Sequence, residues 1–500
     1  MDELAANTNF KPVRLSNATL DSLPAHIKRP TYDRRSLKPG IVHIGVGNFH
    51  RAHQAWYLHR LMQSGDAQDW AILGAGVRAY DASMRDRLVA QDCLTTLIEL
   101  GPTGETAEVI GPMIDYLPVD IGLGALITSL ARPTIKIVTL TVTEGGYYVD
   151  PASNGFHAEH EDLVHDALNL QTPRTAFGAI VAALTIRRDA GYGAFTVLSC
   201  DNLQGNGAIV RQAVVSLAEL VDKGLADWIA ANCTFPNSMV DSIVPATGPD
   251  EVALAARLGV VDAAPVAHEN FRQWVIEDSF CAGRPDLDRV GAVFSSNVHA
   301  YEAMKLRILN AGHQLLANAG ELLGLPTIDV CMEHPLVGAF FTRVQRKEIL
   351  PHVQSVPGLS VEAYLAQVTE RFENRATKDT TRRVAFDGSA RHTGFVLPVV
   401  RDALDVDAPT HGLALAEALW ARMCYGERED GSIIEPNDPN WVDLVKVARQ
   451  SKDEPIAWLQ QSAYYGDLSN NASFADAFET ALNALWTKGV ERVLEDYLSS

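Results

Sequence analysis

The sequence predicts an α/β fold in which a doubly wound N-terminal domain is followed by a mainly α-helical C-terminal domain. Within residues 1–295, short apolar runs alternate with helical stretches, and this alternation is typical of a parallel sheet covered by helices. A glycine turn follows the first buried run. From Tyr301 onward, apolar residues recur at helical spacing without a comparable series of strands. We therefore expect two domains, 1–295 and 296–500, as the length of 500 residues allows.

The elements of the first domain follow from this pattern in order. After an irregular lead-in, a buried strand at 41–44 leads through the glycine turn into a helix that runs to about Met62. Further strands are expected at 70–73, 94–100, 108–110, 135–140 and 194–199, and helices at 83–91, 121–131 and 175–189. In the second domain, helices are expected near 301–324, 361–373, 411–424, 453–462 and 472–498.

Composition excludes several classes of function. The chain has 42 basic and 62 acidic side chains, a net charge of −20, and no long basic run, so neither a nucleic acid nor an anionic membrane is expected as a partner. Its six cysteines form no CxxC pair, which predicts neither a disulfide framework nor a zinc cluster. No secretory signal and no run of ~18 apolar residues is present. We expect a cytoplasmic protein that uses no metal.

The glycine turn has the pattern GxGxxH over residues 45–50. Gly45 would permit the tight turn, Gly47 would let the backbone approach a pyrophosphate, and the following helix would offer free N–H groups through Asn48 and Phe49. His50 replaces the usual third glycine. The position of the turn, after a buried strand and before a helix, indicates a Rossmann-like dinucleotide site; a plain turn is the alternative.

An acidic residue after the second strand would hold the ribose hydroxyls of a dinucleotide. Asp81 is the candidate, although it lies somewhat beyond the usual spacing, and a helix cap is the alternative. Arg78 lies close by and could instead meet a 2′-phosphate. NAD is therefore the favoured cofactor, with NADP possible.

A second constellation of polar residues lies in the stretch 301–313. On a regular helix with Lys305 at the origin, Glu302, His313 and Asn310 fall at about 60°, ~80° and ~140°, within one sector. The surrounding residues are apolar, so burial of this sector is expected; a solvated polar stripe is the alternative. Arg307 falls outside the sector.

A buried lysine has a chemical use. Burial disfavours the charged form and lowers the lysine pKa from about 10.4, so that the amine can act as a general base. In alcohol oxidation, such a base takes the hydroxyl proton while hydride leaves carbon, and an amide donor such as Asn310 can hold the developing alkoxide. Tyr301 and Lys305 also match the YxxxK pair of short-chain dehydrogenases, but the glycine turn lacks that family's GxxxGxG pattern.

Seven stretches, taken together and in order, resemble the polyol-specific long-chain dehydrogenases and reductases. They are 41–57, 139–148, 199–207, 235–245, 274–280, 301–313 and 382–392. The resemblance implies a zinc-independent, commonly monomeric NAD(P) enzyme. It also implies a Rossmann-like N-terminal part, a mainly helical C-terminal part and an active site that uses both.

The resemblance also implies roles for individual residues. Lys305 resembles the family's catalytic base, and Asn202 and Asn310 resemble the pair that forms the oxyanion hole. His313 resembles the group that orients the substrate and bonds its reacting end, and Glu302 resembles the acid that gates a proton path from the lysine to water.

Three further positions match the family pattern. Arg383 and Asp241 resemble groups that bind the other hydroxyls of the substrate, and Glu144 would lie near the nicotinamide. Without the resemblance, Asn202 would be interpreted as a loop cap, Arg383 as a surface charge and Asp241 as a turn residue.

The resulting hypothesis is reversible oxidation of a hexitol such as D-mannitol at C2 to the ketose D-fructose. The alternatives with the same fold are a fructuronate or tagaturonate reductase and an arabinitol or altritol dehydrogenase. A uronate would need a further cation, and Arg307 points away from the sector of Lys305, so a neutral polyol is favoured. A non-catalytic sugar or nucleotide sensor is the alternative from another class.

Overall fold

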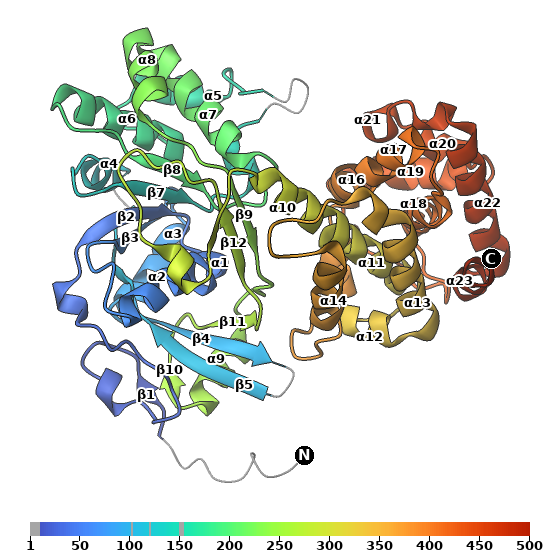
Figure 1. The fold of residues 1–500 in the computed structure, drawn as a ribbon, viewed down its shortest axis with the longest axis horizontal. Coiled ribbons are helices and arrows are strands. Elements are labelled where there is room, and N and C mark those ends of the chain that lie inside the picture. The colour runs from blue at the N-terminus through green and yellow to red at the C-terminus, as the bar shows by residue number, and fades with distance from the viewer. Residues whose placement is uncertain (1–10, 102–103, 120–121, 150–154) are drawn as a thin grey trace. The chain divides into compact units, whose positions relative to one another are not determined.

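The computed structural model describes residues 11–101, 104–119, 122–149 and 155–500 (Figure 1). The chain divides into two compact units, Met1–His299 and Ala300–Ser500. The helix α10 (Val298–Met304) carries the chain from the first unit to the second. Each unit is described by itself.

The first unit is built on a parallel sheet. Its strand order is β6-β3-β2-β7-β8, which in chain order is 3-2-1-4-5, the doubly wound arrangement of a Rossmann fold. This confirms the predicted fold class. The strands are β2 (Pro39–Ile44), β3 (Ala71–Ala75), β6 (Met113–Tyr116), β7 (Ile137–Leu140) and β8 (Thr196–Ser199).

Helices pack on both faces of this sheet, which is why its strands consist of apolar residues almost throughout. Val42 and Ile44 of β2 belong to a core that includes the helices α4 (Gly124–Leu130), α6 (Ala176–Asp189) and α7 (Asn206–Val221). Ile41 of the same strand belongs to a second core with α2 (Gln54–Gln63). Successive β2 side chains thus enter different cores, as the two-residue period of a strand requires.

Smaller sheets complete the first unit. The strands β4 (Thr95–Gly101) and β5 (Gly104–Ile110) were expected from their pattern, but they pair antiparallel outside the main sheet, with β11 (Val266–Glu269) added at the edge. The strands β9 (Ser238–Asp241), β12 (Gln273–Ile276) and β13 (Val293–Phe294) form another sheet, and β1 (Val13–Arg14) pairs with β10 (Val260–Val261). The main sheet also contains β6, which the sequence pattern did not reveal.

The second unit, described throughout, consists of helices and contains no strand. Its centre is α11 (Ala311–Leu323), which is buried along nearly its whole length. Around α11 lie α12 (Ile328–Glu333), α13 (Pro335–Val344), α15 (Thr381–Ala385), α16 (Gly388–Arg391), α18 (His411–Met423) and α23 (Val490–Ser499). The mainly helical character of this unit confirms the prediction.

Three π-turns lie within the described residues, all in this unit: η5 (Lys305–Asn310), η6 (Gln345–Ile349) and η8 (His392–Val396). The turn η5 contacts both of the others. Periodicity had predicted one regular helix over 301–324, and the π-turn is a departure from it.

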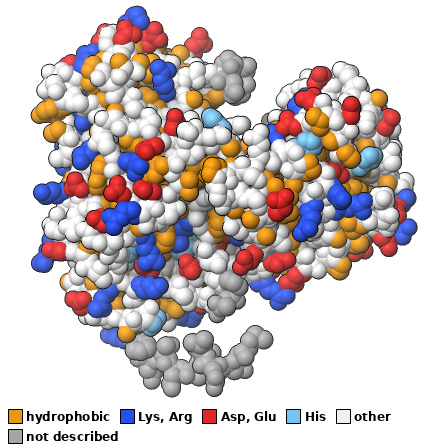
Figure 2. Space-filling model, in the orientation of Figure 1, with side chains coloured by type: hydrophobic (Ala, Val, Ile, Leu, Met, Phe, Trp, Pro, Cys, Tyr) orange, Lys and Arg blue, Asp and Glu red, His pale blue; other side chains and the backbone are white. Residues whose placement is uncertain are grey.

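The surface shows no segregation of charge on the visible face, where basic and acidic side chains are interspersed (Figure 2). Among the described residues, no helix is both long and apolar enough to cross a bilayer.

Candidate functional site

The glycine turn follows β2 at the point where the strand order of the sheet reverses, between β2 and β7. Gly45 has a φ of +96°, and a Cβ at this position would overlap the carbonyl oxygen of Thr141, which follows β7. Only glycine fits there. A Cβ on Gly47, by contrast, would find nothing nearer than 3.9 Å. The space above Gly47 is open, and this fits the close approach of a pyrophosphate to the backbone.

Asn48 and Phe49 begin the short helix α1 (Asn48–Ala52). The side-chain amide of Asn48 donates to the Pro245 carbonyl at 3.0 Å and to Thr247 Oγ1 at 2.9 Å, and its oxygen accepts from Arg51 at 2.7 Å. The Asn48 side chain is therefore used within the protein. Its backbone N–H remains the group that would face a ligand at this turn.

His50 fills the position of the third glycine by stacking on His43 of β2. The two ring centroids lie 3.3 Å apart at an interplanar angle of 9°, and both side chains are buried. Burial lowers the pKa of His43 to about 3, and burial together with the neighbouring His43 lowers the pKa of His50 well below its usual range. Two neutral, flat rings thus stack between α1 and β2 at the position of the usual third glycine.

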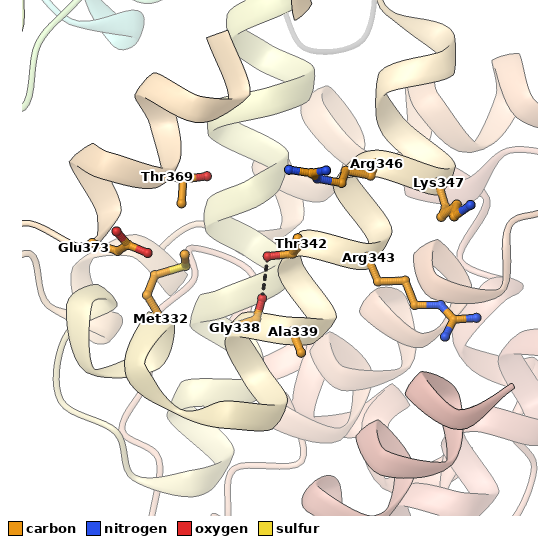
Figure 3. A pocket seen from close by; sticks show the side chains of 9 residues that line it. All are labelled: Met332, Gly338, Ala339, Thr342, Arg343, Arg346, Lys347, Thr369 and Glu373. Carbon is orange, nitrogen blue, oxygen red and sulfur yellow. Dashed lines mark hydrogen bonds between the residues drawn. The ribbon is translucent and has the colours of Figure 1, made fainter. Parts of the chain in front are cut away.

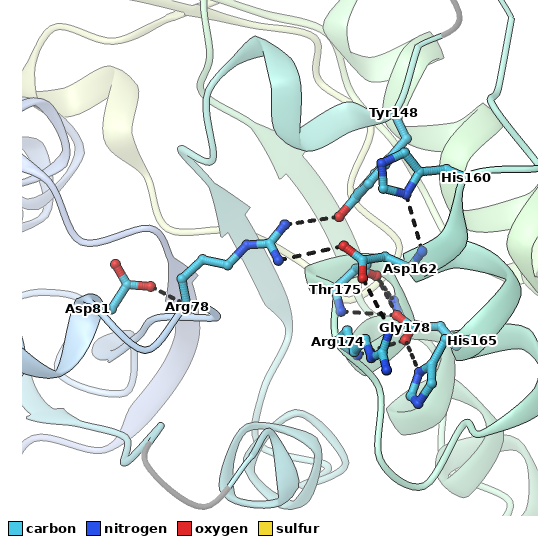
Figure 4. Close-up of polar contacts among 10 residues, drawn as sticks. Arg78, Asp81, Tyr148, His160, Asp162, His165, Arg174, Thr175 and Gly178 are labelled. Carbon is cyan, nitrogen blue, oxygen red and sulfur yellow. Dashed lines mark hydrogen bonds and ion pairs between the residues drawn. The ribbon is translucent and has the colours of Figure 1, made fainter.

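Asp81 is the first residue of α3 (Asp81–Val89), after β3. Its Oδ2 atom accepts hydrogen bonds from the backbone N–H groups of Val77 and Arg78, both at 2.9 Å, and so shapes the loop that follows β3. Figure 4 shows the bond to Arg78. The Arg78 guanidinium points away from Asp81, towards Tyr148 Oη at 3.2 Å and Asp162 Oδ2 at 3.6 Å (Figure 4).

The loops after β7 and β8 meet because these strands are neighbours in the sheet. Asp201 joins them: its carboxylate accepts from Val142 N at 2.9 Å, from Thr143 N at 3.2 Å and from the Tyr147 hydroxyl at 2.6 Å. Asn202 follows in an exposed position. The candidate Glu144 begins η3 (Glu144–Tyr147), but its side chain lies outside the described residues. Sequence reasoning missed Asp201, although it directly precedes Asn202.

Asp241 ends β9 and is buried. A hydrogen bond joins the start of this strand to the end of β8, since Ser238 Oγ donates to the Ser199 carbonyl at 2.6 Å. The Asn206 side chain bonds both backbone groups of Ser238, at 2.8 and 2.9 Å. The elements that carry Asn202 and Asp241 therefore pack together.

The other candidates belong to the second unit. Glu302, Lys305 and His313 are 5%, 7% and 8% exposed, so the prediction of a buried polar sector is confirmed for these three. Asn310 is half-buried, and its side-chain amide has no hydrogen-bond partner among the described residues. A π-turn bonds each residue to the fifth along the chain, so Asn310 is rotated less from Lys305 than it would be on a regular helix. The separation of about 140° was calculated for a regular helix, and the π-turn does not have that geometry.

Asp379 links two of the candidates. The Arg383 guanidinium forms a bidentate ion pair with its carboxylate, with Nε 2.6 Å from Oδ1 and Nη2 2.5 Å from Oδ2. His313 Nε2 lies 4.0 Å from Asp379 Oδ2. The His313 ring also stacks on Phe372, with centroids 4.3 Å apart. Sequence reasoning missed Asp379. Its position four residues before Arg383 could have indicated an ion pair between the two side chains.

Two adjoining hollows of about 390 and 700 Å³ lie on the second unit, against α13, η6 and α14 (Val361–Phe372). They share Thr342, Arg346, Thr369 and Glu373, and Figure 3 shows the smaller one. No candidate site residue lines either hollow. Among the described residues, no group of three or more His, Cys, Asp or Glu side chains could hold a metal ion.

Comparison with known families finds two matches that span most of the chain. The model of the mannitol dehydrogenase Rossmann domain matches residues 39–289, and that of the mannitol dehydrogenase C-terminal domain matches 297–486. A mannitol 2-dehydrogenase of Cereibacter sphaeroides is 53% identical, covering 95% of this chain and 99% of that protein. One of Aspergillus terreus is 38% identical, covering 97% and 99%.

Two solved structures are similar over nearly the full length. The ternary complex of Pseudomonas fluorescens mannitol 2-dehydrogenase with NAD and D-mannitol is 38% identical, with a TM-score of 0.88, and covers 98% of this chain and 100% of that one. A D-sorbitol dehydrogenase in substrate-free form is 36% identical, with a TM-score of 0.89, and covers 96% and 100%.

Proposed function

Since this chain belongs to the mannitol dehydrogenase family, we propose that it catalyses the reversible, NAD-dependent oxidation of D-mannitol at C2 to D-fructose. One observation carries the proposal. The structure of a relative described as a complex with NAD and D-mannitol matches this chain over 98% of its length.

The dinucleotide would be held by the first unit. Gly45 makes the turn possible, the open space above Gly47 admits the pyrophosphate, and the backbone N–H groups of Asn48 and Phe49 would bond it. Asp81 would bind the ribose hydroxyls through the oxygen that does not hold the loop. When bound, NAD supplies the acceptor for the hydride.

The side chains that move the proton belong mainly to the second unit. The Lys305 amine takes the proton of the reacting hydroxyl, and Glu302 passes it on to water. The amides of Asn310 and Asn202 donate hydrogen bonds to the substrate oxygen as negative charge develops on it. His313, which stacks on Phe372 and lies near Asp379, orients that oxygen.

The remaining candidates would position the substrate and the cofactor. Arg383, fixed by Asp379, and Asp241 would bind the other hydroxyls of the polyol, and Glu144 would lie near the nicotinamide. Arg307 is engaged elsewhere: its Nη1 lies 2.7 Å from Asp402 Oδ2 and also donates to the His352 carbonyl. A uronate carboxylate would not find its cation there, and this favours a neutral polyol.

The choice of NAD over NADP rests on the loop after β3. A 2′-phosphate would meet the negative charge of Asp81 and would need Arg78 as its partner. Arg78 is already bonded to Tyr148 and Asp162.

D-Sorbitol is the second candidate substrate, because the similarity to a D-sorbitol dehydrogenase is as extensive as the similarity to the mannitol enzyme.

A substrate panel run with both cofactors tests the proposal. Mannitol, sorbitol, arabinitol and fructuronate are assayed side by side with NAD(H) and NADP(H). We expect the highest kcat/KM for mannitol with NAD. A many-fold preference for fructuronate would replace the proposal with a uronate reductase, and NADH binding without turnover of any polyol would indicate a sensor.

We also propose that the protein acts as a monomer in the cytoplasm. A net charge of −20 disfavours self-association. The six cysteines, all within the described residues, are free thiols, as is usual in a reducing compartment. Light scattering on a sizing column should give a mass of 54.4 kDa; a mass of twice that value would contradict the monomer.

A further inference from the structure

We propose that Gln345 is a positioning residue for the base-bearing turn, Lys305–Asn310. Its side-chain amide would keep this segment in the π conformation, which rotates Asn310 closer to Lys305 than a regular helix would. The inference rests on the proposed function in one respect: it takes Lys305 and Asn310 as the groups that act on the substrate oxygen.

The contact itself is short and fully buried. Gln345 is 0% exposed, and its Nε2 donates a hydrogen bond of 2.6 Å to the carbonyl oxygen of Ile308, in the middle of η5. Gln345 is the first residue of η6, so the amide of one π-turn supports the backbone of another.

The backbone of η5 needs such support because a π-turn interrupts the regular hydrogen-bond ladder of a helix. The N–H of Ala311 is divided between the carbonyls of Leu306 and Ile308. π-Turns are rare and occur frequently at functional sites, and a side chain that enters the ladder is one recognised cause of such a distortion. A second donor for the Ile308 carbonyl therefore stabilises the π-turn against a regular helix.

The surrounding residues leave room for this hydrogen bond. A Cβ on Gly312 would come within 2.7 Å of Gln345 Nε2 and within 2.8 Å of Phe341, so the glycine allows the amide to reach the helix. Phe341 packs on Phe372, with ring centroids 5.7 Å apart, and Phe372 stacks on His313. The same wall of the unit thus supports the Lys305–Asn310 turn and His313.

The next two residues of η6 provide a matched control. Arg346 and Lys347 are exposed and line the hollow of Figure 3, and their side chains have no hydrogen bond or ion pair among the described residues. A substitution of Arg346 changes the same π-turn but leaves the bond to Ile308 in place.

The test compares the wild type with Gln345→Met and Arg346→Gln. Methionine keeps the volume of glutamine and removes the donor. We expect Gln345→Met to lower kcat roughly 10- to 100-fold, since small misplacements of catalytic groups cost about this much. The KM for mannitol and the affinity for NADH should change little. The isotope effect on kcat with mannitol deuterated at the reacting carbon should rise, a readout that loss of folded protein alone would not move.

Arg346→Gln should stay within about twofold of the wild type, as expected for a surface change. Wild-type kcat and isotope effect in Gln345→Met would overturn the inference, and so would an equal loss in Arg346→Gln. If Gln345→Met does not fold, Gly312→Ala serves instead. Its added methyl group would displace the amide, so the same loss of kcat is expected, and wild-type kcat would overturn the inference.

Amide hydrogen exchange separates this inference from the proposed function. Peptides covering 305–312 should exchange faster in Gln345→Met than in the wild type, and not in Arg346→Gln, whatever the substrate is. If the wild type does not oxidise mannitol, the proposed function fails while this comparison still decides whether Gln345 holds the turn. Equal exchange in all three proteins would overturn the inference.

Discussion

The stacked pair of His43 and His50 replaces the third glycine of the turn and makes the protonation state of each ring matter to the other. The third glycine of a dinucleotide turn normally allows a helix to pack closely on a strand. Here two stacked, buried rings lie between the helix and the strand, and His43 is bonded to Thr139 Oγ1 at 2.8 Å. The arrangement requires neutral imidazoles, because a second positive charge at 3.3 Å has no carboxylate to balance it among the described contacts.

This requirement predicts a dependence of stability on pH. The pKa of His43 is about 3 in the folded chain and about 6.5 in the unfolded chain, so the unfolded chain binds more protons between these values. His43 should therefore cost about 1.4 kcal/mol of stability for each unit that the pH falls below 6.5. Chemical unfolding between pH 7 and pH 4.5 measures this slope. His43→Gln should reduce it, and an unchanged slope would contradict the prediction.

Asp81 offers a second prediction at the scale of the residue. Asp81→Asn keeps an oxygen for the N–H groups of Val77 and Arg78 but removes the negative charge. We expect the ratio of kcat/KM for NADP to that for NAD to rise roughly tenfold, equivalent to about 1.4 kcal/mol. Steady-state kinetics with each cofactor measure the ratio. If the ratio stays the same, Asp81 does not face the ribose.

The residues of the candidate site and those that support them differ in how clearly the sequence marks them. The polar groups of 301–313 stand out because they interrupt an apolar helical pattern. Asp379 and Gln345 stand in ordinary polar surroundings, and their contacts with His313 and Ile308 join residues 66 and 37 positions apart. No local pattern marks such pairs, since only the packing of the helices creates them.

At the scale of the element, the sequence likewise predicts which segments are strands or helices, but not how they pair or where a helix departs from regular geometry. Short apolar runs predict strands at 94–100 and 108–110, but they contain no information on the sheet that β4 and β5 join. Helical periodicity likewise assumes a constant rotation per residue, and η5 adds one residue to a turn without any local signal. The existence of these elements was predictable, but their partners and the π-turns were not.

A buried polar network joins several helices of the second unit. Glu417 of α18 accepts from His392 at 2.7 Å and from the Tyr465 hydroxyl at 2.7 Å, and that hydroxyl accepts from Trp458 at 2.6 Å. Asn318 of α11 donates to the other nitrogen of His392 at 2.8 Å. Each member is fully buried or nearly so, and every bond connects two different helical segments.

Removal of the Tyr465 hydroxyl tests how much this network contributes to the stability of the fold. Tyr465→Phe leaves a carboxylate oxygen and an indole N–H buried without that partner, so we expect a loss of roughly 2–4 kcal/mol in the free energy of unfolding. Chemical denaturation measures it. The half-buried neighbour in Tyr464→Phe is the control and should cost less than about 1 kcal/mol. Equal effects of the two substitutions would show that the network adds nothing specific.

At the scale of the whole molecule, the proposed function divides cofactor binding and proton transfer between two kinds of architecture. The dinucleotide turn belongs to a parallel sheet, where Gly45 lies at the reversal of strand order. The buried lysine belongs to a helical unit, where it begins a π-turn that ends at Asn310. This division was predictable because the hydrophobic period changes from strand-like to helical along the chain. The net charge of −20 contributes nothing to it.

The division predicts that chemistry and cofactor affinity can be separated. Lys305→Ala removes the proposed base in the second unit and leaves Gly45, Gly47 and Asp81 of the first unit unchanged. We expect kcat to fall roughly 10²- to 10⁴-fold, the usual contribution of a general base. The dissociation constant of NADH, followed by its fluorescence, should stay within about twofold, because the groups proposed to bind it are unaltered. Lys347→Ala, an exposed lysine of the same unit, is the control for lost charge. Turnover near the wild-type rate in Lys305→Ala would refute the assignment of the base. A matching loss of NADH binding would instead show that Lys305 acts through the cofactor, since a group needed only for proton transfer leaves binding of the dinucleotide intact.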